Sequence, residues 1–419
     1  MINYAKFPNR YIACIDMMSF YASCMASLHS LDVQKVPIAV VGNLEQRGSV
    51  VLAASPPMKK RFRVKTGTRL YEIPQHPDIR LFNPKMSYFL EVSMAITHLL
   101  HKYVPAESIH VYSVDESFID LTGTEKLWGN PVQTVKVIQQ EIYATLGLPS
   151  TAGMGPNMLM AKLALDIEAK KTGFAKWAFE DVPEKLWPVS PLSEMWGIGR
   201  QTEKTLNNMG IFSVGDLAHA NLQSLEKKFG VMGNQLFHHA WGVDLSEMGA
   251  PILEGQISYG KSQILMRDYT LREEVNVVLL EMCEDIARRV REEYKIGRTI
   301  SLGIGYSKNA FGGGFRRSRT IGEATNDTMK IYEVCKELLN ENYSHQAVRQ
   351  ISISITKLED ERSMQLSLFD TGKWQVRKLG TTMDTIRTRY GDVAILRAVS
   401  LTNAGTAIKR SKLVGGHQG

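Results

Sequence analysis

Two adjacent carboxylates, Asp115 and Glu116, stand in a segment that otherwise has the composition of a β-strand, residues 112–120. Strands favour Val, Ile, Phe and Tyr and are poor in Asp, so an acidic pair there is electrostatically costly unless a positive group neutralises it. A bound divalent metal ion does this directly. A tight hairpin turn with a solvated acidic tip is the alternative that the pair by itself leaves open.

A third carboxylate lies far earlier in the chain. Asp16 ends the apolar run of residues 12–15, which suits a buried strand. Together with Asp115 and Glu116 it supplies three oxygen ligands of the kind that hard cations prefer. Two Mg²⁺ ions about 4 Å apart could share such ligands, which is the arrangement used for in-line phosphoryl or nucleotidyl transfer.

Residues 10–23 and 112–120 together resemble the two catalytic motifs of the Y-family, or translesion, DNA polymerases, with the closest match in the UmuC-like branch. The resemblance extends from about residue 10 to about residue 370. It implies a template-directed DNA polymerase for translesion synthesis in DNA damage tolerance and repair, which adds dNMP to a primer 3′-hydroxyl. Asp16 and Asp115 would bridge two Mg²⁺ ions, Glu116 would hold the ion that activates the hydroxyl, and Met17 would offer its backbone carbonyl.

The length and composition of the chain agree with this. A chain of 419 residues exceeds what one core usually organises, so roughly two to four domains are expected. The four cysteines have no metal-ligand spacing and fit a reducing cytosol. No apolar stretch reaches the length of a membrane span and no signal-peptide pattern is present, so we expect a cytoplasmic protein without a membrane partner.

The net charge of +7 comes from one segment. Residues 371–419 hold nine Lys or Arg and two Asp, and this excess equals the net charge of the whole chain. The remainder is neutral overall, so its contacts with DNA must come from local patches. For the basic tail itself we predict only electrostatic attraction to DNA or another acidic partner.

The order of the expected elements predicts the fold class. Strand, helix, strand pair, helix and strand, followed by a helix from residue 157 to about 171, suit an antiparallel sheet backed by helices. The resemblance implies an α+β, right-hand polymerase with a ferredoxin-like palm, small fingers, a helical thumb and a separate α/β little-finger domain. The implied boundaries are 1–19 and 85–180 for the palm, 20–84 for the fingers, 181–245 for the thumb with a helix–hairpin–helix, 255–358 for the little finger, and 359–419 for a clamp-binding motif and basic tail.

Three residues are implied to bind the incoming nucleotide. Tyr21 matches the aromatic residue that packs under the sugar and rejects ribonucleotides, although its spacing alone also suits a core aromatic. Lys60 matches a basic fingers residue that contacts the triphosphate, and the other interpretation of the cationic run 59–61 is a solvated cluster. Lys170 matches a palm lysine on the triphosphate, with Lys171 as the alternative, and a lysine there would also complement a helix C-terminus.

Two further segments are implied to bind DNA. Gly197 and Gly199 lie between expected helices, where amides without a neighbouring Cβ approach a phosphate, although Gly-Ile-Gly also occurs in ordinary helix connections. Lone cations on edge strands commonly deter aggregation, but a cluster in the expected little finger favours phosphate contacts along a duplex. That cluster consists of Lys261, Arg316, Arg317 and Arg319.

Residues 365–370 match the peptide that bacterial sliding-clamp partners insert into a hydrophobic groove, with a buried strand as the alternative. The anchors would be Gln365, Leu366, Leu368 and Phe369. The expected partners are therefore primer-template DNA, dNTP and a bacterial sliding clamp. Relatives in the UmuC-like branch can depend on accessory proteins, which makes SOS-response proteins further candidates.

Two other classes of function remain open. A non-catalytic DNA-binding or regulatory protein could keep the scaffold, but the three intact carboxylates argue against it. A nucleotidyl cyclase on a similar palm would have no use for a helix–hairpin–helix, a basic little finger or a clamp peptide. No segment resembles a proofreading exonuclease.

Overall fold

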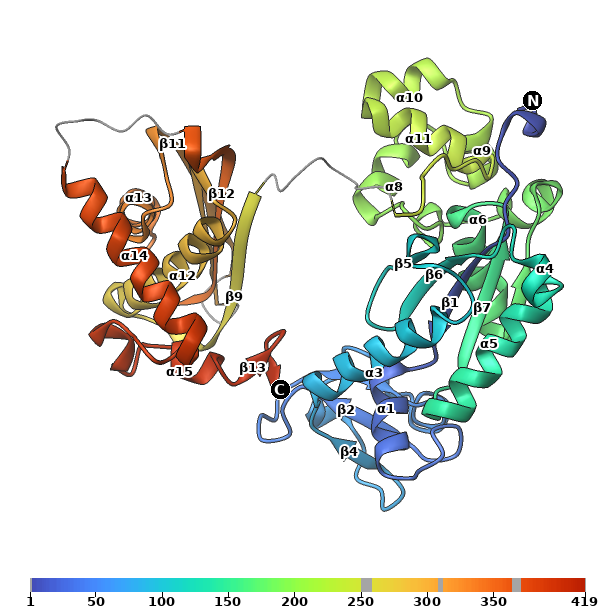
Figure 1. Cartoon of the computed structure of the whole chain (residues 1–419), viewed down its shortest axis with the longest axis horizontal. Coiled ribbons are helices and arrows are strands. Elements are labelled where there is room, and N and C mark those ends of the chain that lie inside the picture. The colour runs from blue at the N-terminus through green and yellow to red at the C-terminus, as the bar shows by residue number, and fades with distance from the viewer. Residues whose placement is uncertain (1, 250–257, 308–311, 364–370, 419) are drawn as a thin grey trace. The chain divides into compact units, whose positions relative to one another are not determined.

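The computed structural model describes residues 2–249, 258–307, 312–363 and 371–418 (Figure 1). The chain forms two compact units, Met1–Pro251 together with His417–Gly419, and Ile252–Gly416. Each unit has its own sheets and its own hydrophobic core. Among the described residues, no helix combines the length and the apolarity that crossing a bilayer requires.

The first unit is built on a five-stranded sheet in the order β5-β6-β1-β7-β8. Its strands are β1 (Ile12–Met17), β5 (Ile109–Val111), β6 (Glu116–Asp120), β7 (Ser150–Gly155) and β8 (Phe174–Lys176). The apolar β1 is central and pairs antiparallel with both β6 and β7. The predicted antiparallel pairing is therefore confirmed for β5, β6, β1 and β7, while the edge strand β8 pairs parallel with β7, and the helices behind the sheet are confirmed. These are α3 (Met86–Leu100), α5 (Pro131–Leu146) and α6 (Met158–Leu163).

A smaller sheet in the order β3-β2-β4 forms the fingers. Its strands are β2 (Ile38–Val41), β3 (Val51–Ala54) and β4 (Arg80–Phe82), and the helices are α1 (Phe20–Leu28) and α2 (Pro56–Phe62). Both prolines of α2 lie in its first turn, where a missing N–H and a fixed φ are tolerated. Buried Met58 of α2 packs with Val41 and Val51, so the lysines that follow it are held on a short, anchored helix.

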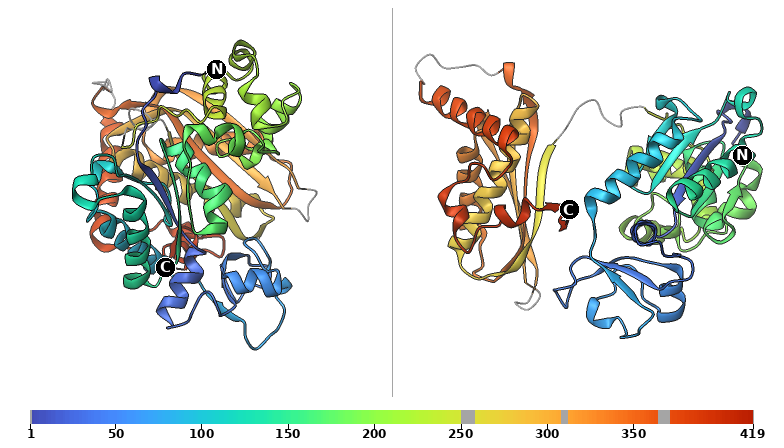
Figure 2. Two further views of the ribbon diagram at one scale, coloured as in Figure 1. Left: turned by 90° about the vertical axis from the view of Figure 1, so that its right-hand side faces the viewer. Right: turned by 60° about the horizontal axis from the view of Figure 1, so that its bottom comes forward.

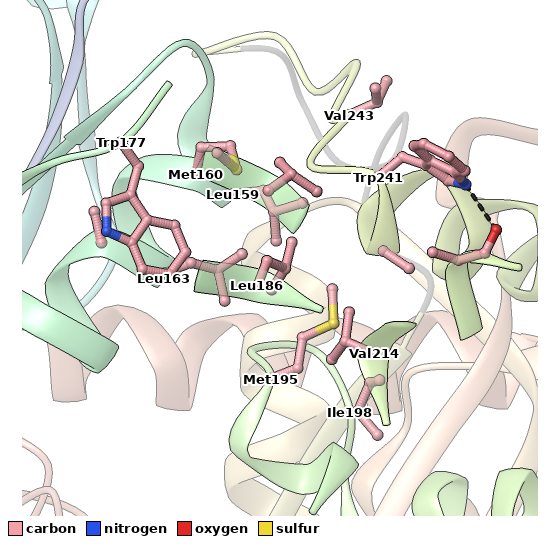
Figure 3. Packing of buried hydrophobic residues seen from close by; sticks show 14 of the residues in the cluster. Leu159, Met160, Leu163, Trp177, Leu186, Met195, Ile198, Val214, Trp241 and Val243 are labelled. Atoms are coloured by element: carbon pink, nitrogen blue, oxygen red, sulfur yellow. Dashed lines mark hydrogen bonds between the residues drawn. The ribbon is translucent and has the colours of Figure 1, made fainter. Parts of the chain in front are cut away.

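Four short helices form the thumb: α8 (Arg200–Asn207), α9 (Val214–Ala218), α10 (Leu222–Phe229) and α11 (Val231–Ala240). Leu159 and Leu163 of palm helix α6 share one hydrophobic core with Val214 and Trp241 (Figure 3). Trp241 Nε1 also donates a hydrogen bond to the carbonyl of Ala218 at 2.8 Å. The shared core fixes the thumb helices to the palm.

The helix after β7 contains a wide turn. It begins as α6, continues as a π-helix over Ala164–Ala169 and ends as α7 (Lys170–Thr172). A π turn closes its hydrogen bond from i to i+5, one residue more than an α turn. The helix lies directly against β7 at Gly153, where a Cβ would be 2.2 Å from the amide nitrogen of Leu165.

The second unit has a four-stranded antiparallel sheet in the order β11-β10-β12-β9, with its helices on one face (Figure 2). The strands are β9 (Ser258–Tyr269), β10 (Lys295–Tyr306), β11 (Gly314–Thr325) and β12 (Val348–Asp360), and the main helices are α12 (Arg272–Glu292) and α13 (Thr328–Asn342). Strands and helices alternate as predicted for the little finger. The two faces differ in composition because side chains alternate along each strand.

The helix-facing side of this sheet is apolar, and the opposite side, called here the open face, is small and polar. Ile300, Leu302, Ile351 and Ile353 belong to the buried core. The open face consists of cross-strand rows of Ser, Thr and Gly: Thr320-Thr299-Thr356-Ser258, Ser318-Ser301-Ser354-Gly260 and Arg316-Gly303-Ser352-Ser262.

The sequence predicts a tail that is separate from the little finger, but the structure joins the two. Helices α14 (Thr371–Tyr390) and α15 (Ala407–Arg410) belong to the second compact unit. Asp384 accepts two hydrogen bonds from Arg291 of α12, at 2.6 and 3.0 Å. Buried Arg387 lies 3.1 Å from Glu284. The tail packs on the little finger because part of its cationic charge forms ion pairs with acidic residues of α12. A net charge summed over the segment does not reveal such pairs.

Candidate active site

The three predicted carboxylates meet at one end of the palm sheet. Asp16 of β1 is the register partner of Glu116 in β6. Asp115 directly precedes β6, and its carbonyl accepts a hydrogen bond from the amide of Met17 at 2.9 Å. Residues opposite each other in an antiparallel pair direct their side chains to the same face. The pairing of two strands distant in sequence therefore gathers the acidic groups, as the metal hypothesis requires.

Glu116 is held by a lysine that the sequence analysis did not select. Lys162 Nζ lies 2.7 Å from Glu116 Oε1 and 2.9 Å from Oε2, and both side chains are buried. Cys14 Sγ donates a third hydrogen bond to Glu116 Oε1 at 2.9 Å. Burial alone would lower the pKa of Lys162, but the hydrogen bond and the charge of Glu116 outweigh it and raise that pKa. Lys162 is therefore a permanent ammonium ion at the base of the site.

A second lysine reaches the site from the end of the same helix. Lys170 Nζ is 2.6 Å from Asp166 Oδ1 and 3.9 Å from Asp16 Oδ2. Asp166 also lies 3.3 Å from Lys162. Lys162, Asp166 and Lys170 are spaced by four residues, slightly more than the 3.6 residues of one α-helical turn. The wider π turn between Lys162 and Lys170 compensates for this difference, so the three side chains stay on one face of the helix. Of the two lysines left open by sequence, the geometry thus brings Lys170 rather than Lys171 to Asp16.

Asp16 has an unusual electrostatic environment. Burial raises the pKa of its carboxyl group to about 7, and nearby Asp115 and Glu116 add to the rise while Lys170 opposes it. Asp115 is fixed on its other side by the hydroxyl of Ser113, which donates a hydrogen bond of 2.6 Å. The cluster therefore carries negative charge that the two lysines do not fully balance.

The raised pKa of Asp16 predicts a pH dependence of the metal-free protein. Its folded-state pKa of about 7 exceeds the ordinary value of the unfolded chain, so between pH ~4 and ~7 the folded state binds the extra proton and stability falls as pH rises. Asp16→Asn removes this titration. We expect the variant to gain about 2 kcal/mol relative to wild type between about pH 5 and about pH 7, measured by urea unfolding in EDTA. Equal pH dependence in the two proteins would contradict the assignment.

The oxygen donors of the site differ in how well they suit a divalent metal ion. The described residues contain no group of three or more His, Cys, Asp or Glu side chains arranged closely enough to hold an ion. Carboxylate and carbonyl oxygens are nevertheless the ligands that Mg²⁺ prefers, and Asp16, Asp115 and Met17 supply them. Glu116 is the exception, because Lys162 engages both of its oxygens. In donor chemistry Asp16, Asp115 and Met17 fit Mg²⁺, whereas Glu116 would fit it only without its contacts to Lys162.

Tyr21 and a lysine of the fingers lie near the carboxylates. Tyr21 stacks on Phe89 with ring centroids 4.5 Å apart, and burial, assisted by the charge of Asp115, raises the pKa of Tyr21. Lys59, not the predicted Lys60, donates a hydrogen bond to Ser19 at 3.1 Å. Burial lowers the pKa of Lys59, while Asp16 opposes the shift, which places Lys59 within the electrostatic field of the carboxylates.

Four residues of this site were missed by sequence reasoning: Cys14, Lys59, Lys162 and Asp166. A signal was available for two of them, because residues 162, 166 and 170 recur at intervals of four and so share one helix face. Cys14 and Lys59 offered no such periodic signal.

The predicted thumb glycines lie in an open turn. Gly197 has a φ of +92°, which favours glycine, and Gly199 is the N-cap of α8. A Cβ at either position would meet no atom within 4 Å. Buried Ile198 anchors the turn between them. The geometry leaves the backbone accessible, as a phosphate contact would need.

The four little-finger cations do not share one surface. Lys261 lies 3.0 Å from Asp285 of α12, and Arg319 pairs with Glu337 and Glu341 of α13. Arg317 is the register partner of buried Leu302, which also places it on the helix-facing side. The exception is Arg316, in the row of Gly303 and Ser352 on the open face. Alternation along the strands thus divides the cations between the two faces, and their contact with DNA stays a prediction.

The predicted clamp peptide, Gln365, Leu366, Leu368 and Phe369, lies outside the described residues. The elements on either side of it are connected, because Arg377 of α14 lies 2.9 Å from Glu361.

Comparison with known proteins gives consistent matches along the chain. The impB/mucB/samB family matches residues 15–166, its C-terminal domain matches 256–368, and the HHH motif of the IMS family matches 180–211. The Bacillus subtilis (strain 168) protein UvrX, whose name associates it with UV-damage repair, is 54% identical over 420 residues, with 100% of both chains covered.

Two further matches concern polymerases. DNA polymerase IV 2 of Bacillus subtilis (strain 168) is 36% identical over 412 residues, which cover 97% of this chain and 98% of that protein. A solved chimera of the Y-family DNA polymerases Dbh and Dpo4 superposes with a TM-score of 0.64 at 20% identity, covering 83% of this chain and 98% of its own. The superposition bears on the fold, and the curated relatives bear on the family.

Proposed function

The chain belongs to the Y-family DNA polymerases, the impB/mucB/samB family, and on this premise we propose that it performs translesion synthesis by two-metal nucleotidyl transfer. The observation that carries the proposal is the meeting of Asp16, Asp115 and Glu116 at one end of the palm sheet. Oxygen donors from two paired strands are suited to hard divalent cations, for which we propose Mg²⁺.

In the proposed reaction the residues of the chain have separate tasks. Asp16 and Asp115 would hold both ions, with the carbonyl of Met17 as a further ligand, and Glu116 would hold the ion nearer the primer. Mg²⁺ supplies Lewis-acid activation of the 3′-hydroxyl and stabilises charge on the departing pyrophosphate. Lys170 lies beside Asp16 and would bind the triphosphate, whose charge two metal ions do not fully offset. For the fingers contact, the geometry favours Lys59 over Lys60.

Tyr21 is proposed to exclude ribonucleotides by packing under the sugar. Stacking on Phe89 holds the Tyr21 ring in place, so the 2′-hydroxyl of a ribonucleotide would clash with the ring. We expect Tyr21→Ala to raise the kcat/KM of ribonucleotides relative to deoxynucleotides by about 10²-fold, measured with single-nucleotide incorporation. Val51→Ala is the control, because Val51 is buried in a fingers core that does not include Tyr21, so its loss should lower stability without changing sugar choice. Equal sugar selectivity in Tyr21→Ala and wild type would refute the role.

DNA contacts are proposed at two surfaces. The thumb turn at Gly197 and Gly199 offers backbone amides to a phosphate, and the open face of the little finger offers hydroxyl groups and Arg316. We also propose that residues 365–369 bind a bacterial sliding clamp and that accessory SOS proteins contribute to activity.

Primer extension on an undamaged and on an abasic template tests the proposed function. Mg²⁺-dependent extension of both templates, with release of pyrophosphate, is the expected result. Release of cyclic nucleotide would identify a cyclase instead. DNA binding without extension, even with sliding clamp and accessory proteins added, would favour a regulatory protein on a polymerase scaffold.

A further inference from the structure

A buried lysine engages the carboxylate that polymerase chemistry needs. Both oxygens of Glu116 lie within 2.9 Å of Lys162 Nζ, and the two side chains are only 9% and 8% exposed. Cys14 donates to one of the same oxygens. A metal ion can therefore bind Glu116 only if Lys162 gives up at least one of these contacts.

A second carboxylate, that of Asp166, lies close enough to Lys162 to form an alternative ion pair. Asp166 Oδ1 is 3.3 Å from Lys162 Nζ, and it also accepts a hydrogen bond of 2.6 Å from Lys170, which in turn lies 3.9 Å from Asp16. Asp16 and Glu116 are register partners. The five side chains thus form a row in which carboxylates and ammonium groups alternate, with Glu116 and Asp16 of the paired strands at its two ends.

We propose that Lys162 is a positioning residue that serves as the resident counter-ion of Glu116. In the metal-free protein its ammonium group neutralises Glu116; when a divalent ion binds, Lys162 passes to Asp166 and Lys170 is released from Asp166 toward the triphosphate. This inference rests on the proposed two-metal site.

The chemistry of the groups supports this exchange. A buried carboxylate beside two others is costly without a cation, so the folded site needs a positive charge before metal arrives. Lysine suits the task because its ammonium group is a compact charge on a flexible stem. Lys162 already lies between its two partners, so a change of side-chain rotamer completes the transfer without movement of the helix.

Competition between Lys162 and metal can be measured without catalysis. Mn²⁺ binding to the full chain, in the absence of DNA and nucleotide, is titrated by calorimetry for wild type, Lys162→Met and Lys162→Arg. We expect Lys162→Met to bind Mn²⁺ about tenfold more tightly, because the competing charge is gone. Lys162→Arg should bind it several-fold more weakly, because a guanidinium grips a carboxylate with two parallel hydrogen bonds.

Thermal unfolding gives a second readout. Without its counter-ion, Lys162→Met should be destabilised in EDTA and should gain more from added Mn²⁺ than wild type does. Lys185→Met is the matched control, since Lys185 also lies between two carboxylates of the same unit, 3.2 Å from Glu168 and 3.5 Å from Asp181. It should lose stability equally in EDTA and in Mn²⁺.

Each outcome has a distinct meaning. Tighter binding by Lys162→Met and weaker binding by Lys162→Arg support the exchange. If Lys162→Met does not fold in EDTA, Lys162→Arg alone decides. Mn²⁺ affinity that is unchanged in every folded Lys162 variant, while wild type binds the ion, overturns the inference and leaves the proposed function intact. Absence of Mn²⁺ binding to wild type would instead refute the proposed metal site.

Discussion

Asp16→Asn is expected to lower the kcat/KM of primer extension by about 10³-fold or more. Substitution of a residue that only supports a metal ligand typically lowers metal affinity or activity by about 10- to 100-fold. Asp16 is itself proposed to contact both ions, so its substitution should cause a larger loss. Asparagine preserves the shape of the side chain and removes one charged oxygen, so the loss reports on the ligand and not on packing. The measurement is single-turnover extension at saturating primer-template.

The matched control lies on the partner strand. Asp120→Asn makes the same substitution in β6, at the position opposite Ile12, and removes the charge of a partly buried carboxylate that lies 3.9 Å from the exposed Arg10. Such surface pairs contribute little, so extension should stay near the wild-type rate. Equal activity of Asp16→Asn and Asp120→Asn would exclude Asp16 as a metal ligand, provided that both variants bind DNA as wild type does.

Gly153→Ala is expected to give the largest loss of stability among single substitutions of the palm. An added Cβ would lie 2.2 Å from the nitrogen of Leu165 and 2.3 Å from the oxygen of Ala161, both backbone atoms of the helix that carries Lys162 and Lys170. Overpacking against side chains usually costs 1–3 kcal/mol, and backbone atoms yield less easily, so we expect about 3 kcal/mol or more.

Urea unfolding of the full chain measures this effect. Gly48→Ala is a suitable control in the same unit, because a Cβ there meets no atom within 4 Å. Its free energy of unfolding should stay within about 0.5 kcal/mol of wild type. An unchanged stability of Gly153→Ala would show that the helix can move away from β7, and the positions of both lysines would then no longer be fixed by that contact.

The carboxylates could be predicted because acidic residues at the ends of apolar strands are unusual for strand composition. This departure can be recognised in the sequence without knowledge of the fold. The same is true of the sheet and helix pattern of both units, which follows from hydrophobic periodicity. Lys162 could not be identified in this way. A lysine in a helix is ordinarily solvated, and its burial depends on Glu116, a residue of another strand that only the folded sheet brings near.

The surroundings of Lys59 and of the little-finger cations could not be predicted for a related reason. Lys59 and Lys60 are neighbours on α2, and about 100° of helical rotation decides which one faces the carboxylates. Lys261 and Arg319 were grouped with Arg316 by proximity, although pleating and the acidic residues of α12 and α13 direct them to the other face. Net charge likewise could not show that Arg387 of the tail is buried against Glu284.

The packing of the tail on the little finger has a consequence for the order in which the two units fold during synthesis. Chains emerge from the ribosome N-terminus first, and domains generally fold as units during synthesis. Palm, fingers and thumb are nearly complete within Met1–Pro251, so they can fold early. The little finger is completed later, because the side chain of Gln263 in its first strand donates to Thr406 and Tyr269 donates to the carbonyl of Ala404. A stop codon shortly after residue 370 would therefore leave the first unit intact and the little finger without its contacts to Thr406 and Ala404.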